Sequence, residues 1–481
     1  MSERELPISE NTSGWFDPKV GIFDKKAEEL RQKILSLPDT VAPSVDGTTY
    51  YISYRGDDAR DGTSPATAWK SATMLFNAPL KKGDVVLFER GGVYRGCQRL
   101  PLISGVNYAA YGEGPKPCLY GSPRNYAAPV YWEKTQDANV WAMTPEGHVT
   151  TPEEIAAKPD RVYEDVGAIV FDHGRQIASA GKKLDYTLTE DLDFYYDMAE
   201  NRLYLYLAAG NPGDVYADIE VITEGSILHH DSSRPNSELY DPVIIENLCM
   251  KYANFGIGAS YVHSMIVRGC EIGYIGGCMA NKTVRFGNGI EIFNHIYHLV
   301  VENNWIYQCY DAGYTNQGHV GVQDNITVRD NLIEYCHYNI EVFESPKNGG
   351  AVTNTVYENN ILRFAGYGFG SYNRIGGCTT QAANIRNPLG IQNVKNFFVR
   401  GNVFDRAQFR LVNSGFVDGV RGPIFEGNTW ALCREDNAMA VKIILQGETV
   451  RDAVELAATY RTTMEAAVAL VDKTATVIFE E

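Results

Sequence analysis

Several kinds of feature are missing from this chain of 481 residues. No run approaches about 18 consecutive apolar residues, so we expect no transmembrane helix and no membrane partner. The formal net charge is −17 and there is no long run of Lys or Arg, so a nucleic-acid partner is not expected either. A Gly-rich phosphate loop and a redox motif are also absent, which predicts a protein without an organic cofactor.

The cysteines and the start of the chain bear on the compartment. The nine cysteines are odd in number and lack CxxC spacing, which favours a reducing compartment over a disulfide framework. The residues from Met1 to Pro7 lack a basic region followed by an apolar core, so no signal peptide is visible there. Together these features predict a cytoplasmic protein. The sequence does not indicate an oligomeric state.

One short phrase recurs along the second half of the chain. It reads Val-Glu-Asn-Asn at 301–304, and the last Asn of each copy stands at Asn304, Asn331, Asn360, Asn402 and Asn428. The intervals are therefore 27, 29, 42 and 26 residues. A repeat of about 20–50 residues indicates stacked supersecondary units. An inserted loop containing 376–381 explains the long interval.

Short β-prone runs lie after and between these phrases, without a helix-length amphipathic segment. This spacing excludes the helical repeat families and predicts a parallel β-helix. An Asn at one place in every coil can form a ladder of stacked side-chain amides. Cys309 and Cys336 are in register with the Asn column, and we expect them to stack inside the coil as an apolar pair without a disulfide.

The repeat pattern also divides the chain. Leu30, Ile34 and Leu37 give a helix near the N-terminus one apolar stripe, which we expect to cap the open end of the solenoid. A helix is predicted over 448–460 and a last strand over 475–479. The expected segments are the N-terminal segment with its capping helix (1–47), the first coils (48–123), an antiparallel β insertion (124–218), the main coils with an active-site groove (219–432) and a C-terminal cap (433–481).

A motif near the start of the coils resembles a known group of proteins. A strand is followed by G-x-D-x-x-D-G-T-x-P at Gly56–Pro65, with Trp69 and Ser71 after it. This pattern resembles the first segment of bacterial β-helix carbohydrate enzymes of the pectate-lyase-like superfold, and 83–95 and 108–117 resemble their first coils. The resemblance implies an all-β, right-handed parallel β-helix with activity on carbohydrate. The residues themselves predict the inserted antiparallel subdomain and the helical caps at the ends.

Two segments place an acidic residue between aliphatic ones. Alternate residues of a strand face opposite sides, so the Ile and Val neighbours of Glu291 and Glu341 are expected to fill the coil and turn both Glu outward. Counted from the Asn column, Tyr314 takes the outward place between them. Asp311 is expected at the start of the same strand, and two strand spacings separate the Glu residues by about 9.5 Å.

Carboxyl groups crowded on one rigid face suit glycoside hydrolysis. Crowding raises a carboxyl pKa, as a general acid requires, and paired carboxyls about 5–9.5 Å apart support retaining or inverting cleavage. We therefore predict Asp311 with one or both of Glu291 and Glu341 as catalytic residues. Asn288–Glu291 and Tyr310–Gly313 also resemble the active-site coils of xylosidase- and fucosidase-like β-helical hydrolases acting on plant or host oligosaccharides. The predicted substrate-binding residues are Asn288, Tyr310, Tyr314, Asn316, Gln317, His319, Tyr338 and Glu344.

Other readings of the same residues stay open. A polysaccharide lyase would use the acidic trio to hold calcium, and a base to abstract a proton beside a uronate carboxylate. Its candidate bases are Lys282, Arg285, Arg374 and Arg386. A non-catalytic glycan-binding solenoid, or an outward face that is merely solvated, is also consistent with the pattern. The hydrolase prediction needs no metal.

Overall fold

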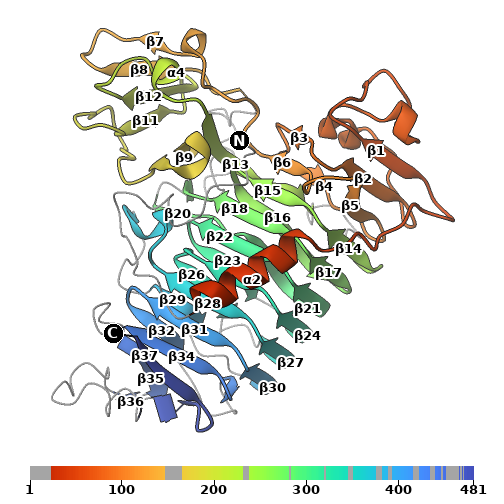
Figure 1. Ribbon diagram of the computed structural model, residues 1–481, viewed down its shortest axis with the longest axis vertical. Helices are drawn as coiled ribbons and strands as arrows, with labels where there is room; N and C mark the ends of the chain where they lie inside the picture. The colour runs from red at the N-terminus through yellow and green to blue at the C-terminus, as the bar shows by residue number, and fades with distance from the viewer. Residues whose placement is uncertain are drawn as a thin grey trace.

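The protein is described from a computed structural model. It covers residues 23–146, 165–230, 238–280, 283–318, 321–344, 350–374, 382–387, 393–414, 422–433, 439–445, 448–450, 465, 468–469 and 471–480. Within these ranges the chain winds into stacked coils, and each strand pairs in parallel with the equivalent strand of the next coil (Figure 1). The parallel β-helix predicted from the Asn column is confirmed.

The coils form three parallel sheets. Sheet 1 contains β3 (Val93–Tyr94), β6 (Cys118–Tyr120), β15 (Cys249–Lys251), β18 (Glu271–Ile275), β22 (Trp305–Cys309), β25 (Leu332–Glu334), β28 (Ile361–Ala365), β31 (Val403–Ala407), β34 (Thr429–Cys433) and β37 (Thr476–Glu480). Sheet 2 contains β1 (Thr49–Ile52), β2 (Val85–Glu89), β5 (Asn107–Tyr111), β14 (Val243–Glu246), β17 (Met265–Arg268), β24 (Val322–Arg329), β27 (Ala351–Glu358), β30 (Asn393–Arg400) and β33 (Ile424–Glu426).

Sheet 3 carries the predicted site. Its strands are β4 (Leu100–Pro101), β13 (Ile219–His229), β16 (Ala253–Val262), β21 (Ile290–Glu302), β23 (Ala312–Gly318), β26 (Tyr338–Glu344), β29 (Ala383–Asn387), β32 (Arg410–Ser414) and β35 (Met439–Leu445). The long strand β21 belongs to two sheets, because its first residues pair with β16 and β23 and its last residues pair with β17 and β24.

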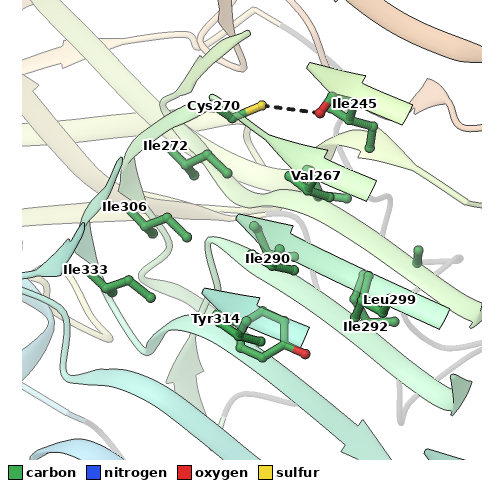
Figure 2. Packing of buried hydrophobic residues seen from close by; sticks show 14 of the residues in the cluster. Ile245, Val267, Cys270, Ile272, Ile290, Ile292, Leu299, Ile306, Tyr314 and Ile333 are labelled. Carbon is green, nitrogen blue, oxygen red and sulfur yellow. Dashed lines mark hydrogen bonds between the residues drawn. The ribbon is translucent and has the colours of Figure 1, made fainter. Parts of the chain in front are cut away.

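Inward side chains of successive coils stack into one core. In sheet 3 the strand register aligns five buried residues in one inward column: Ile257, Ile290, Tyr314, Ile340 and Ile385. Figure 2 shows Ile290 and Tyr314 packed in the core opposite Ile306 and Ile333 of sheet 1. Cys309 and Cys336 are both buried and free and their side chains are in contact, so the prediction of stacked thiols is confirmed. Apolar area removed from water at about 25 cal/mol per Å² stabilises such a column.

The predicted Asn ladder is present at one corner of the coils. Each Asn is fully buried and donates its Nδ2–H to the side-chain oxygen of the Asn one coil later, at 2.9–3.0 Å along the column Asn304, Asn331, Asn360, Asn402 and Asn428. Asn428 in turn donates to Asp472 at 2.8 Å, which ends the ladder with a carboxylate. Buried amides are therefore paired from coil to coil, and this pairing avoids the cost of unsatisfied polar groups.

The N-terminal helix α2 (Asp24–Leu35) lies across the side of the coils instead of capping their open end (Figure 1). Its Ala27 and Ile34 pack with the outward side chains of sheet 1, including Trp305. Arg31 Nη2 also lies 3.1 Å from Glu334 Oε1. The prediction of an end cap is wrong. Aromatic side chains such as Trp305 lie on the outward face of sheet 1, and α2 packs against them and buries them.

No helix within the described ranges has the length and apolar character needed to cross a membrane.

The antiparallel β insertion is present beside the first coils, as predicted. Phe194, Leu203 and Leu205 form a separate small core with Phe171. The inserted sheet contains β7 (Glu133–Lys134), β8 (Val140–Met143), β11 (Phe194–Asp197) and β12 (Arg202–Tyr206), while β9 (Val166–Phe171) and β10 (Gln176–Ala178) join the edge of β13. Other short helices among the described residues include η1 (Pro65–Thr67), η2 (Ala72–Phe76), η3 (Pro129–Tyr131), η4 (Asp172–Gly174), α4 (Pro212–Val215) and η6 (Phe369–Ser371).

Two hairpin-like pairings complete the fold. The strands β19 (Cys278–Ala280) and β20 (Val284–Phe286) pair beside sheet 3. The strand β36 (Glu448–Val450) pairs antiparallel to β35, so the helix predicted over 448–460 begins as a strand, and 451–464 lie outside the described residues. The last strand predicted over 475–479 is confirmed by β37, which pairs in parallel with β34.

Candidate active site

Two outward carboxyl groups stand in one column of sheet 3. Glu291 of β21 pairs with Thr315 of β23, which pairs with Glu341 of β26. The two Glu residues are therefore two strand spacings apart, about 9.5 Å at the backbone. Their aliphatic neighbours Ile290 and Ile340 are fully buried, as the strand alternation predicted.

The predicted outward position of Tyr314 is wrong, because Thr315 occupies that position. Tyr314 is fully buried and pairs with Ile290 and Ile340 in the core (Figure 2). In sheet 1, Tyr307 pairs with Glu334, which is 27 residues later in the chain. In sheet 3, Ala312 pairs with Tyr338, which is only 26 residues later. The corner before β23 thus contains one residue more than the next coil's corner, and a one-residue shift turns a side chain to the other face.

Asp311 lies on the coil between the two Glu residues, directly before β23. Its backbone N–H donates to Gly287 O at 3.0 Å, and its carbonyl accepts from Tyr338 N at 3.0 Å. Arg374 Nη2 donates to Asp311 Oδ1 at 2.7 Å. Arg374 Nη1 is held by two carbonyl oxygens, at 2.7 Å from Tyr310 O and 3.0 Å from Gly370 O. The Arg374 side chain is only 5% exposed, so its positive charge faces Asp311 in a largely dry setting.

Glu341 also has a cationic neighbour. Arg386 of β29, the next strand of sheet 3, places Nη1 at 3.1 Å from Glu341 Oε1. The Arg386 guanidinium lies over the Tyr338 ring, 4.3 Å from its centroid. Thr315 and Gln317 make longer contacts with the other carboxyl oxygen, at 3.4 and 3.5 Å. Arginine, a tyrosine ring and two polar groups therefore surround this carboxyl.

Burial and mutual repulsion perturb both Glu residues. Burial, and after it the charge of Asp311, raises the pKa of Glu341 to about 7, although Arg386 and Arg374 oppose the shift. Burial likewise raises the pKa of Glu291 to about 7, with a lowering hydrogen bond from Asn288 and a raising effect of Asp311. Each Glu thus holds its proton for an appreciable part of the time near neutral pH, as a general acid must.

The structure brings some of the predicted substrate-binding residues to this face and others to different places. Gln317 faces outward beside Glu341. Asn288 is buried, accepts from Ala312 N at 2.8 Å and donates to Glu291 through Nδ2, so it orients the carboxyl. Tyr310 and Tyr338 are also buried and lie beneath the guanidinium groups of the site.

Three other predictions end differently. Asn316 is fully buried and bonds to Tyr357 and Gln323 inside the coil, so the strand alternation that buries Tyr314 also keeps Asn316 off the outward face. His319 lies outside the described residues. Glu344 ends strand β26, and its side chain is outside the described part of the chain.

The sequence patterns did not predict that two arginines bind the carboxyl groups of the site. Arg374 and Arg386 were predicted only as bases of a lyase, and they stand 63 and 45 residues from the acids they contact. Both fall within the single long interval between Asn360 and Asn402. The length of that interval was the available signal, because a long inserted loop can fold back and place its side chains against an earlier coil.

Metal ligation can be judged only for the described residues. Within them, no group of three or more His, Cys, Asp or Glu side chains is placed to hold a metal ion. Arginine contacts two of the three carboxyls of the site, and a guanidinium fits poorly beside a cation. The absence of a metal requirement stays a prediction.

Comparison with known proteins adds a short sequence match. No protein-family model matches the chain. A lacto-N-biosidase of Bifidobacterium longum subsp. longum is 33% identical over 125 residues, which are 24% of this chain and 8% of that protein. The chain therefore matches less than a tenth of the length of this relative.

Solved structures resemble the protein at low identity. XylC in complex with xylose has a TM-score of 0.42 and 12% identity, covering 83% of this chain and 70% of that one. A GH136 lacto-N-biosidase from Eubacterium ramulus has a TM-score of 0.33 and 14% identity, covering 96% and 69%. A polygalacturonase from Erwinia carotovora ssp. carotovora has a TM-score of 0.30 and 10% identity, covering 87% and 99%. All three TM-scores are below 0.5, so the parallel β-helix rests on the strand pairings of this chain.

Proposed function

We propose that the protein is a glycoside hydrolase that cleaves oligosaccharides with a pair of carboxyl groups on the outward face of sheet 3. The observation that carries the proposal is the contrast between the acids of one face. Asp311 is held by Arg374, whereas the pKa of Glu291 and that of Glu341 are both raised to about 7. A glycosidase needs one carboxylate and one protonated carboxyl beside the bond it cleaves.

The roles follow from these environments. Asp311, bonded to a buried guanidinium, acts as the carboxylate that attacks the anomeric carbon or activates water. Glu291 acts as the acid that protonates the leaving oxygen, because Asn288 is its hydrogen-bond partner within the described chain and no arginine pairs with it. Glu341 is the second candidate for the acid, although Arg386 favours its ionised form. Retention or inversion depends on which carboxyls work together.

The short match to a lacto-N-biosidase supports an oligosaccharide substrate, and it puts substrates of that enzyme class first in a screen. The test is a glycan panel with wild type, Asp311→Asn, Glu291→Gln and Glu341→Gln, each with and without EDTA. Product is measured both as reducing ends and as absorbance of an unsaturated uronate. We expect reducing ends without that absorbance, no effect of EDTA, and loss of activity in Asp311→Asn. The exposed Asp46→Asn is the control.

A polysaccharide lyase is the second candidate, and Arg386 is the observation that favours it. Its guanidinium lies beside Glu341 on the outward face, where a uronate carboxylate could reach it. Unsaturated product lost in Arg386→Lys, or activity that EDTA abolishes, would replace the hydrolase proposal. Tight glycan binding without turnover on the whole panel would instead point to a binding solenoid.

A further inference from the structure

Arg285 of strand β20 is a fully buried arginine whose five N–H groups are all used. Nε donates to Gly277 O at 2.9 Å, and Nη2 donates to Gly167 O at 2.8 Å and to Ser179 Oγ at 2.9 Å. Nη1 donates to Ser179 O and to Asn373 O, both at 3.0 Å. Every acceptor is a carbonyl or hydroxyl oxygen. An arginine buried in this way joins backbone segments with fixed geometry.

The joined segments come from distant parts of the chain. Gly167 and Ser179 belong to the antiparallel insertion, and Asn373 immediately precedes Arg374. Asn373 adds two bonds of its own to the insertion, from Nδ2 to Ala180 O at 2.9 Å and to Lys182 O at 2.8 Å. The segment that carries Arg374 is therefore tied to the insertion by Arg285 and by the Asn373 side chain.

The same groups reach the candidate catalytic carboxylate. Tyr310 donates its hydroxyl to Asn373 O at 3.0 Å. Its ring has the Arg285 guanidinium at 4.4 Å and the Arg374 guanidinium at 5.1 Å from its centroid. Arg374 then binds Asp311, the residue that follows Tyr310 in the chain. A continuous path of contacts thus leads from the insertion to the Asp311 carboxylate.

We infer that Arg285 and Asn373 are positioning residues, through which the antiparallel insertion holds Arg374 against Asp311. The inference rests on the proposed function only in treating Asp311 as catalytic. The insertion is then a required part of the active site. Contacts of this kind matter because a misplacement of about 1 Å at a reacting group can cost about 100-fold in rate.

Two substitutions, one at Arg285 and one at Asn373, test the inference by removing side-chain hydrogen bonds while leaving the backbone segments in place. Arg285→Lys keeps the positive charge but has only three N–H donors and no planar face. Asn373→Gly keeps the left-handed backbone (φ of 50°) and removes the bonds to Ala180 and Lys182. Matched controls are Arg406→Lys, at a buried arginine bonded to Asp405, and Asn247→Gly, at another left-handed Asn (φ of 57°) whose Nδ2 donates to two carbonyl oxygens.

We expect both test variants to lower kcat by about 10- to 100-fold with little change in KM. The groups that face Asp311 are Arg374, Glu291, Glu341, Tyr310 and Tyr338. Both test variants displace Arg374, which is the cation of this set. We therefore also expect an altered pH dependence of kcat/KM. Amide hydrogen exchange of 368–374 should become faster. The controls should lose a similar amount of thermal stability while keeping kcat and the pH dependence.

The inference is overturned if both test variants keep the wild-type kcat and pH dependence while their Tm falls as in the controls. Arg285 would then only attach the insertion to the coils. If wild type turns over no glycan, the proposed function fails by itself. The positioning inference is then decided by the exchange data and by a crystal structure of Arg285→Lys. An Arg374 guanidinium that stays hydrogen-bonded to Asp311, with unchanged exchange, would overturn it.

Discussion

Glu291 and Glu341 occupy equivalent outward positions on two strands of sheet 3 that are separated by one strand. The rigid pairing of the coils holds their backbones about two strand spacings apart, near 9.5 Å. Thr315 stands between them, and Asp311 directly precedes the intervening strand. The spacing of the acids is therefore a property of the β-helix itself.

The register of this column predicts opposite effects for two neighbouring residues. The Tyr314 hydroxyl is buried, and no described atom forms a hydrogen bond with it. We expect Tyr314→Phe to leave kcat/KM unchanged and to stabilise the protein by about 1 kcal/mol, since it removes an unsatisfied polar group. Thr315→Tyr, which puts a ring between the two Glu residues, should lower kcat/KM strongly. Thermal denaturation and steady-state assays test both. Loss of activity in Tyr314→Phe with little effect of Thr315→Tyr would contradict the register.

The raised pKa values predict the alkaline limb of activity. An acid with a pKa of about 7 loses its proton above that pH, so kcat/KM should fall as pH rises through about 7. In Glu291→Gln the limb should disappear, and residual activity should be best on aryl glycosides whose leaving group needs no proton. The same measurement on Glu341→Gln shows which Glu is the acid. If kcat/KM still falls above about pH 7 in both variants as it does in wild type, neither Glu is the general acid.

Stability should depend on pH at the same residue. The pKa of Glu291 is raised from an ordinary value of 4.5 to about 7, so the folded state binds a proton more tightly than the unfolded state. Its contribution to stability is therefore greatest below pH 4.5 and decreases until about pH 7. We expect Glu291→Gln to raise the free energy of unfolding by about 1–3 kcal/mol at pH 8, with a smaller gain at pH 5.

Calorimetric scans at the two pH values check this, with the exposed Glu113→Gln as the control. An equal change at both pH values would show that the carboxyl is not destabilised by its surroundings.

The Asn ladder predicts a purely structural loss. Asn331 accepts from the N and Nδ2 of Asn304, at 2.9 and 3.0 Å, and donates to Val301 O and Asn360 Oδ1, both at 2.9 Å. Asn331→Ala leaves these buried groups unpaired, and we expect a loss of about 2–4 kcal/mol in the free energy of unfolding. Thermal denaturation of folded protein measures it, and KM should not change. The exposed Asn77→Ala is the control, and an equal effect there would contradict the ladder's role.

The sequence by itself determined the coil architecture and the outward direction of Glu291 and Glu341. Both follow from local periodicity, because the recurrent Asn marks one corner of every coil and strand alternation separates core from surface. The antiparallel β insertion and the stacked thiols were also predicted from sequence patterns.

Only the tertiary structure decided which residues complete the site. One additional residue at a corner exchanged Tyr314 for Thr315, and no periodic count detects a change of corner length. Arg374 and Arg386 reach Asp311 and Glu341 across 63 and 45 residues, and α2 covers a sheet whose strands follow it much later in the chain. Such contacts depend on where distant segments return in space, and residue spacing does not encode that return.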